Sequence, residues 1–270
     1  DFAVIECTVF EKIELAGPGF LNFFVSSEWF SGTVNAVLKE KENYGKTDDG
    51  KGKRVLVEFV SANPTGPMHI GNARGGALGD CLASLLQYAG YYVEREFYIN
   101  DAGNQINKFA LSLDIRYRQH FGDPVEMPED SYHGQDIIDH AENFAKEYGD
   151  KYLKASEEER RQALVNYALP INIKGLEEDL LKYRIKYDTW FKESTLHNDG
   201  SVAEVIELLK EKGYTYEQDG ALWFRSSELG DDKDRVLIRA NGVPTYSVPD
   251  IAYHYNKLVK RGFDTAIDVL

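Results

Sequence analysis

The stretch that decides the fold runs from Val55 to Ile99 and begins Val55-Leu56-Val57-Glu58-Phe59-Val60. This nearly continuous apolar run is typical of a strand that is buried on both faces of a sheet. A helix is predicted to follow after a loop and to run to about Ala89, where Gly90 would end it. Tyr92–Ile99 is predicted as a second strand. Strand, helix and strand in so short a stretch predict a βαβ unit and therefore a parallel sheet.

Apolar side chains predict how the elements around this unit pack. The helix between the two strands has leucines that we expect on one buried face: Leu78, Leu82, Leu85 and Leu86. The helix predicted after Asn100-Asp101 has its own apolar set: Ile106, Phe109, Ala110, Leu113 and Tyr117. Ala266–Leu270 is predicted as another buried strand. The fold class predicted from these elements is α/β.

The first fifty residues are predicted to be a short α+β segment followed by a linker. Val9–Leu15 and Phe20–Val25 have the pattern of strands, and Ser26 or Ser27 is placed to cap a helix. A polar, glycine-bearing stretch follows at 47–52. We expect residues 1–46 to be too few to hold a core of their own.

The stretch 121–234 has a different character and is predicted to be a mainly helical insertion. Its predicted helices are polar and mix acidic with basic residues, at 134–153, 156–187 and 199–212. Towards the end of the chain, Ala221–Arg225 and Arg235–Arg239 are strand-like, and Asn241-Gly242 is typical of a hairpin turn. Pro249 suits the first turn of a last helix that runs past Leu258.

Composition and charge exclude several classes of protein. The net charge of −14 argues against a generally cationic nucleic-acid binder, so we expect no general affinity for nucleic acid. No apolar run approaches the ~20 residues of a membrane span, so no membrane partner is expected. Cys7 and Cys81 are far apart, which favours reduced thiols over a disulfide framework or a zinc site. His133 and His140 have no third ligand nearby, so no structural metal is expected.

The loop Ser61–Asn72 is the strongest candidate for chemistry, because ligands bind at the carboxyl ends of parallel strands. It has neither the Gly-Lys-Ser/Thr ending of a Walker loop nor a GxGxxG fingerprint. Small residues at the helix start let a flat ring or a phosphate approach the backbone: Gly71, Ala73, Gly75, Gly76, Ala77 and Gly79. The residues alone leave two interpretations, a nucleotide-binding loop or an ordinary βα turn in which His69 is a packing residue.

Residues Pro64–Asn72 resemble the HIGH motif of class I aminoacyl-tRNA synthetases. The surrounding sequence is similar to arginyl-tRNA synthetases in particular, in order along the chain, at Val57–Gly66, Arg74-Gly75, Gly79-Asp80, Tyr98–Ile106, Gly242–Tyr246 and Asp250–His254. One departure is Asn72, which stands where the motif has its second histidine. Asparagine donates a hydrogen bond but carries no proton charge.

The resemblance implies a Rossmann-like parallel sheet, the first half of a class I catalytic core, at 51–120 and 235–270. The implied insertion is 121–234, and residues 1–50 would be the end of an accessory domain plus a linker. The family's lysine-bearing KMSK loop and anticodon-binding domain have no counterpart in the sequence. We therefore expect a fragment that is inactive by itself.

The resemblance also implies an activity, arginine–tRNA ligation in the cytoplasm. Arginine would be activated with ATP and Mg²⁺ to arginyl-adenylate and then transferred to tRNA(Arg). The implied catalytic residues are His69 and Asn72. The implied ATP-binding residues are Pro64, Thr65, Gly66, His69, Gly71 and Asn72. The implied arginine-binding residues are Glu58, Asn63, Tyr246 and Asp250.

Chemistry supports the acidic pair in part. A guanidinium is best bound by carboxylates in bidentate geometry. An acid within the apolar run is costly to bury without a partner, which singles out Glu58 independently, although an exposed strand end is the alternative. For Asp250 the alternative is an acid that favours a helix N-terminus.

Several interpretations stay open. The function alternatives are another adenylate-forming or nucleotidyl-transferring enzyme of the same superfamily, and a synthetase-like binding module without catalysis. Asn100, Asp101 and Gln105 either shape the site or, for Asp101, cap a helix. Lys51, Lys53 and Arg54 either contact RNA or form a solvated strand start.

Overall fold

The computed structural model describes residues 9–269, so Cys7 and Leu270 lie outside the described part of the chain. Its contacts divide the chain between Asp48 and Asp49 into two compact units. The first unit holds β1 (Phe10–Ala16), β2 (Phe20–Val25) and α1 (Ser27–Glu40).

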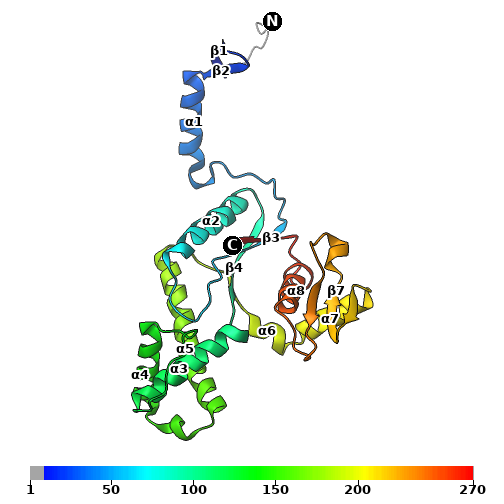
Figure 1. Ribbon diagram of the computed structural model, residues 1–270. Coiled ribbons are helices and arrows are strands. Elements are labelled where there is room, and N and C mark those ends of the chain that lie inside the picture. Colours follow the sequence, from blue (N-terminus) through cyan, green and yellow to red (C-terminus); the bar gives the residue numbers. More distant parts are fainter. Residues whose placement is uncertain (1–8, 270) are drawn as a thin grey trace. The chain divides into compact units, whose positions relative to one another are not determined.

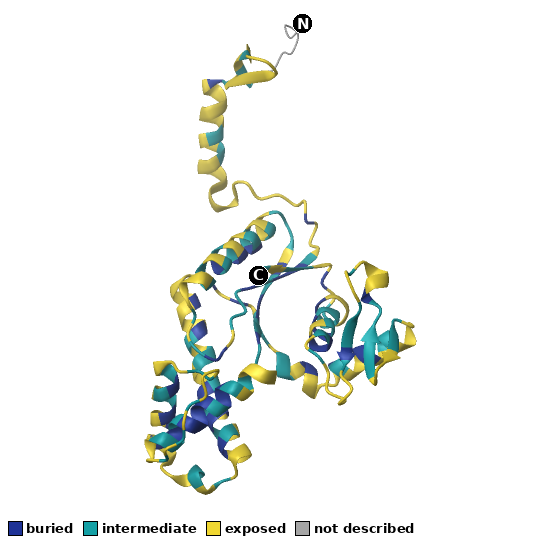
Figure 2. Ribbon diagram, in the orientation of Figure 1, coloured by how far each residue is buried: buried dark blue, intermediate teal, exposed yellow. Residues whose placement is uncertain are grey.

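The first unit has the two predicted strands and the predicted helix. β1 and β2 pair in antiparallel fashion, and the Ser26 hydroxyl accepts a hydrogen bond from the Trp29 N–H at 3.3 Å, which caps α1. The described residues of α1 include no buried one, and Figure 2 shows the helix exposed along its length. This agrees with the expectation that the segment is too small to hold its own core.

The second unit is built on a parallel four-stranded sheet with the order β5-β4-β3-β9 (Figure 1). The strands are β3 (Arg54–Phe59), β4 (Tyr92–Ile99), β5 (Thr189–Lys192) and β9 (Thr265–Val269). β3 is central and pairs with β4 and β9, and α2 (Ile70–Tyr88) connects β3 to β4. The predicted βαβ unit and the α/β fold class are confirmed.

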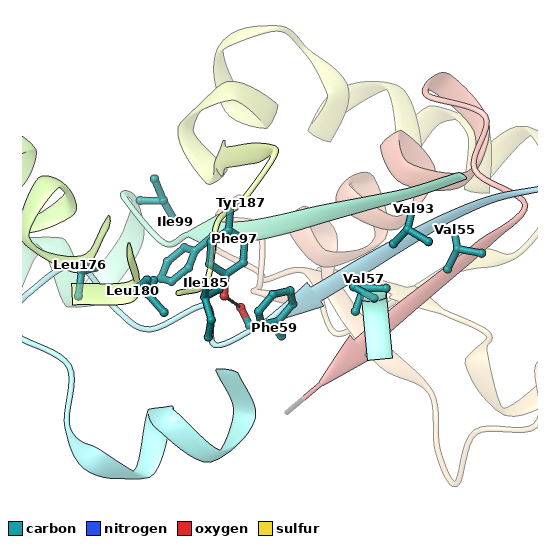
Figure 3. Packing of buried hydrophobic residues seen from close by; sticks show 11 residues of the cluster. Val55, Val57, Phe59, Val93, Phe97, Ile99, Leu176, Leu180, Ile185 and Tyr187 are labelled. Atoms are coloured by element: carbon teal, nitrogen blue, oxygen red, sulfur yellow. Dashed lines mark hydrogen bonds between the residues drawn. The ribbon is translucent and has the colours of Figure 1, made fainter. Parts of the chain in front are cut away.

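One face of the sheet packs against α2 and the end of α5. Val55, Val57 and Phe59 alternate along β3 towards this core (Figure 3), and the Tyr187 hydroxyl donates to the Phe59 carbonyl at 2.9 Å. The predicted leucine face of α2 was half wrong. Leu82 and Leu86 pack on the core, but Leu78 and Leu85 are exposed.

The reason for this error is the close approach of α2 to the sheet. The buried residues of α2 are Gly76, Gly79 and Ala83, and a Cβ at Gly79 would overlap the ring of Phe59. Small side chains therefore form the contact strip, and two of the leucines are turned away from it.

A second core lies among three helices, α3 (Gly103–His120), α4 (Gln135–Tyr148) and α5 (Glu157–Lys182). Figure 2 shows buried positions gathered where these helices meet. The predicted helix 134–153 ends earlier, at Tyr148, because Gly149 with φ = 59° caps it, and a short 3₁₀ turn Lys151–Lys154 follows. The predicted helix 156–187 ends at Lys182, just before Arg184 with φ = 65°.

The remaining elements are α6 (Glu193–Asn198), α7 (Ser201–Glu211), β6 (Thr215–Gln218), β7 (Ala221–Phe224), β8 (Arg235–Ile238) and α8 (Ser247–Tyr255). β6, β7 and β8 form an antiparallel sheet. After β8, the Gly242 N–H donates to the Arg239 carbonyl at 2.8 Å, which closes the expected turn.

Two short strands were missed by the sequence analysis, β5 and β6. β5 lies within the stretch 121–234 and yet forms an edge of the parallel sheet. The predicted insertion boundaries therefore remain a prediction. No helix within residues 9–269 is long and apolar enough to cross a membrane.

Candidate active site

The candidate site begins where β3 ends in an unusual turn. Val60 has φ = 69° and Ser61 has φ = 40°, a left-handed conformation that costs non-glycine residues about 1–3 kcal/mol each. The Ser61 hydroxyl donates to Glu58 Oε1 at 2.8 Å and accepts from the Tyr98 N–H at 3.0 Å. These two bonds hold the turn against β3 and β4, so the loop leaves the sheet in a defined direction.

The loop that follows is held in place at Pro64 and Thr65 and has exposed residues on either side of them. Pro64 and Thr65 are buried, and the Asn172 amide of α5 donates to the Pro64 carbonyl at 2.9 Å. Asn63 and His69 are exposed. The loop therefore presents polar groups on a rigid support, which is the arrangement expected of a binding loop.

His69 and Asn72 together cap α2. His69 Nδ1 accepts from the Gly71 N–H at 3.1 Å, and Asn72 Oδ1 accepts from the His69 N–H at 3.1 Å. Because Nδ1 accepts, the neutral imidazole carries its proton on Nε2, where it serves as a donor to an anion at the helix N-terminus. Asn72 has a clear structural role here, since it completes the cap.

Tyr246 and Asp250 lie one helical turn apart at the start of α8. The Asp250 N–H donates to the Tyr246 carbonyl at 3.4 Å, and both side chains are exposed, Tyr246 at 82%. His254 is one further turn along, and its Nδ1 lies 3.6 Å from Asp250 Oδ1. The Asp250 carboxylate is thus open to an incoming cation.

Glu58 is not an exposed strand end. Its side chain is only 12% exposed, and Oε2 accepts a hydrogen bond from Nζ of Lys257 at 2.6 Å. Lys257 is fully buried and also donates to Asp268 at 2.7 Å. Lys257 therefore supplies the opposite charge that the largely buried Glu58 needs.

Glu193 is a candidate residue that the sequence analysis missed. It begins α6, directly after β5, and its side chain is 15% exposed. Burial is the main reason why the pKa of the Tyr98 hydroxyl is far above its ordinary value, and the carboxylates of Glu193, Glu58 and Asp250 raise it further. The charges of these three carboxylates therefore all act on the Tyr98 hydroxyl. An acid directly after the short run Thr189–Lys192, which contains Trp190 and Phe191, is the signal that would have found Glu193.

The other sequence candidates have mainly structural roles. Asp101 does not cap α3 but accepts hydrogen bonds from the Ser194 N–H at 2.8 Å and hydroxyl at 2.7 Å. Gln105 accepts from the Tyr132 hydroxyl at 3.0 Å. Arg54 donates to the Arg261 carbonyl at 2.6 Å, whereas Lys51 and Lys53 are exposed.

Within residues 9–269, the other histidines, the cysteine and the pockets described below give no second candidate site. His140 Nε2 pairs with Asn172 Oδ1 at 2.7 Å, and Cys81 is a free thiol. Across residues 9–269, no group of three or more His, Cys, Asp or Glu side chains is arranged to hold a metal ion. Two pockets of about 620 Å³ and about 980 Å³ lie along α5, and neither includes Glu58 or His69.

A parallel sheet whose central strand leads through a polar loop into a capped helix is the arrangement of a Rossmann-like α/β domain. Residues 33–270 match the family described as tRNA synthetases class I (R), catalytic domain. The arginine–tRNA ligase of Acetivibrio thermocellus is 56% identical over 265 residues, which cover 97% of this chain and 47% of that relative. The arginine–tRNA ligase of Caldanaerobacter subterraneus subsp. tengcongensis is 59% identical over 262 residues, with the same coverage of 97% and 47%.

Solved structures agree with these relatives. A Campylobacter jejuni structure assigned as an arginyl-tRNA synthetase superposes with a TM-score of 0.80 at 36% identity, covering 90% of this chain and 53% of that one. The Thermus thermophilus arginyl-tRNA synthetase superposes with a TM-score of 0.63 at 26% identity, covering 93% and 42%. The chain belongs to the catalytic-domain family of the arginine-type class I tRNA synthetases. It spans about half the length of the curated relatives it matches.

Proposed function

We propose that this chain forms part of the catalytic domain of an arginine–tRNA ligase that works in the cytoplasm. The observation that carries the proposal is the position of Glu58, near the carboxyl end of β3, and of Glu193, directly after β5, at the edge of the sheet from which the His69 loop also leaves. Asp250 lies in the first turn of α8, whose Tyr253 ring is 4.5 Å from the ring of Tyr98. Carboxylates are the best partners of a guanidinium, and the N-terminus of a helix favours a phosphate.

On the ATP side, we assign Pro64, Thr65, Gly66, His69, Gly71 and Asn72 as contacts of the nucleotide. His69 Nε2 would donate to a phosphate oxygen, since Nδ1 already accepts from the Gly71 N–H. Asn72 would act by holding the loop end in place. Mg²⁺ would arrive as part of the ATP substrate.

On the arginine side, Asp250 and Tyr246 would bind the guanidinium, and Asn63 would bind the α-amino group. Glu193 would add a second carboxylate. Each oxygen of Glu58 already accepts one hydrogen bond, from Ser61 or from Lys257. Glu58 would therefore contact arginine only through its remaining lone pairs, and Asp250 would carry the larger share of the binding.

The chemistry needs no nucleophile from the protein. A carboxylate oxygen of arginine attacks the α-phosphorus of ATP, and the bond to pyrophosphate breaks. A hydroxyl of the terminal adenosine of tRNA(Arg) then attacks the acyl carbon, and AMP leaves. The residues above supply orientation and charge stabilisation, which are the main contributions to such transfers.

The test uses the full-length protein that contains these 270 residues, with tRNA(Arg), ATP and Mg²⁺. We expect ATP–pyrophosphate exchange that depends on L-arginine and is absent with citrulline, its uncharged isostere. Exchange with another small acid and no need for RNA would favour a different adenylate-forming enzyme. Adenosine or arginine binding without any exchange would favour a binding module.

A further inference from the structure

Three acidic side chains lie at one register position on three adjacent parallel strands. Glu58 of β3 is opposite Glu96 of β4 on one side and opposite Asp268 of β9 on the other. Adjacent strands are about 4.8 Å apart, and residues in register point to the same face. Carboxylates this close repel one another unless cations lie between them.

The last turn of α8 and the segment after it supply these cations at helical spacing, from His254, Lys257 and Arg261. Lys257 Nζ bridges Glu58 and Asp268, at 2.6 and 2.7 Å. Arg261 pairs with Glu96 and Glu94, and His254 Nε2 lies 3.1 Å from Asp268. The Tyr253 hydroxyl also donates to Glu96 at 2.6 Å.

Lys257 has a distinctive local structure. It lies in a π-helical turn, Asn256–Lys260, and its ammonium is 4.0 Å from the centre of the Tyr253 ring. π turns are rare and occur often at functional sites. This turn places the lysine, fully buried, between β3, which is far from it in the sequence, and β9, which follows it closely.

A series of hydrogen bonds connects Lys257 to the start of the candidate ATP loop. Glu58 holds Lys257 with Oε2 and the Ser61 hydroxyl with Oε1, and Ser61 in turn accepts from the Tyr98 N–H. Ser61 belongs to the turn with positive φ from which the loop starts. Such a turn persists only where its surroundings over-determine it.

We propose that Lys257 is a positioning residue that holds Glu58 and, through Ser61, sets where the loop Pro64–His69 lies. The proposal rests on the proposed function, because that loop is assigned to ATP. In this proposal the main role of Glu58 is to support the loop through Ser61. Neither Lys257 nor Ser61 need contact a substrate.

The experiment compares Lys257→Met with Arg261→Met in the full-length ligase. Both variants remove a cation that pairs with two carboxylates of the sheet, but only Lys257 is connected to Ser61. We expect Lys257→Met to lower kcat for arginine activation by about 100-fold, as for a misplaced reacting group, with arginine KM nearly unchanged. Arg261→Met should leave kcat within about twofold of the unaltered enzyme.

Ser61→Ala covers the case in which Lys257→Met fails to fold. It breaks the same connection without removing a buried charge, so kcat should fall and arginine KM should stay. Unchanged kcat in Ser61→Ala, or equal losses in Lys257→Met and Arg261→Met, would overturn the proposal.

Amide NMR of the 270-residue chain separates this proposal from the proposed function. The Tyr98 amide resonance should shift in Ser61→Ala and in Lys257→Met but stay in place in Arg261→Met. If the unaltered ligase does not activate arginine, the proposed function fails, whereas the Tyr98 resonance still decides whether Lys257 supports the turn. A Tyr98 amide that is unmoved in Lys257→Met refutes the positioning role.

Discussion

The backbone N–H of His69 donates to Asn72 Oδ1 at 3.1 Å, and this bond closes one half of the cap of α2. The other half is the bond from the Gly71 N–H to His69 Nδ1. Asn72, which departs from the family's motif, thus holds His69, which matches the motif. Asn72 contributes through geometry, which requires no proton charge.

Replacing Asn72 by alanine should destabilise the start of α2. The cap loses one acceptor, so we expect the free energy of unfolding to fall by about 1 kcal/mol. Asn72→Asp keeps an acceptor oxygen at the same place and should lose less. Urea unfolding of both variants measures this, and equal stability of Asn72→Ala and the unaltered chain would contradict the capping role.

Asp250→Asn should weaken arginine binding specifically. The substitution keeps the shape but removes the charge of an exposed carboxylate whose nearest cation is His254 at 3.6 Å. A hydrogen bond to a charged group contributes about 1.5–3 kcal/mol, so the arginine KM should rise about 10- to 100-fold. The ATP KM should not change. Asp139→Asn, on α4, is the matched control, and an effect of the same size there would count against the assignment.

Two glycines of α2 should respond in opposite ways to alanine. A Cβ at Gly79 would overlap the Phe59 ring, so Gly79→Ala should destabilise the protein by about 1–3 kcal/mol. A Cβ at Gly75 meets nothing within 4 Å, so Gly75→Ala should stabilise the helix by up to about 1 kcal/mol. Thermal unfolding of the pair checks this, and the same sign for both would show that α2 does not pack as described.

Stability should depend on pH through His254. The hydrogen bond to Asp268 raises the pKa of His254, against the effect of burial and of the charge on Lys257. The same bond lowers the pKa of Asp268. Because the pKa of His254 is higher in the folded state, its stabilisation is complete below the unfolded value of about 6.5 and is lost as pH rises through the folded value.

The measurement for His254 is the free energy of unfolding of the unaltered chain and of His254→Gln across neutral pH. We expect the two proteins to differ most at the acidic end of this range and to converge as pH rises. A difference that grows with pH would show that the imidazole is neutral in this contact.

Local patterns in the sequence were enough for the elements that they describe. The apolar run from Val55 predicted the central strand, and Tyr92–Ile99 was predicted with the bounds that the structure has. Of the two predicted caps of α1, Ser26 and Ser27, the structure has Ser26. Each of these depends on neighbours within one or two turns, so the information lies in the segment itself. The loop with His69 was found for the same reason.

Only the tertiary structure decided the contacts between elements that are distant in the sequence. β5 is short and has no alternation to mark it, so Glu193 at its end was missed. Leu78 was predicted to be buried, but the glycines of α2 bring the sheet so close that Leu78 is turned outward. Lys257 and Glu58 are 199 positions apart, and a lysine in a polar helix gives no local sign of burial. The pair forms because the sheet places Glu58 beside Asp268, and the repulsion between these adjacent carboxylates is offset by a cation that the fold brings from elsewhere.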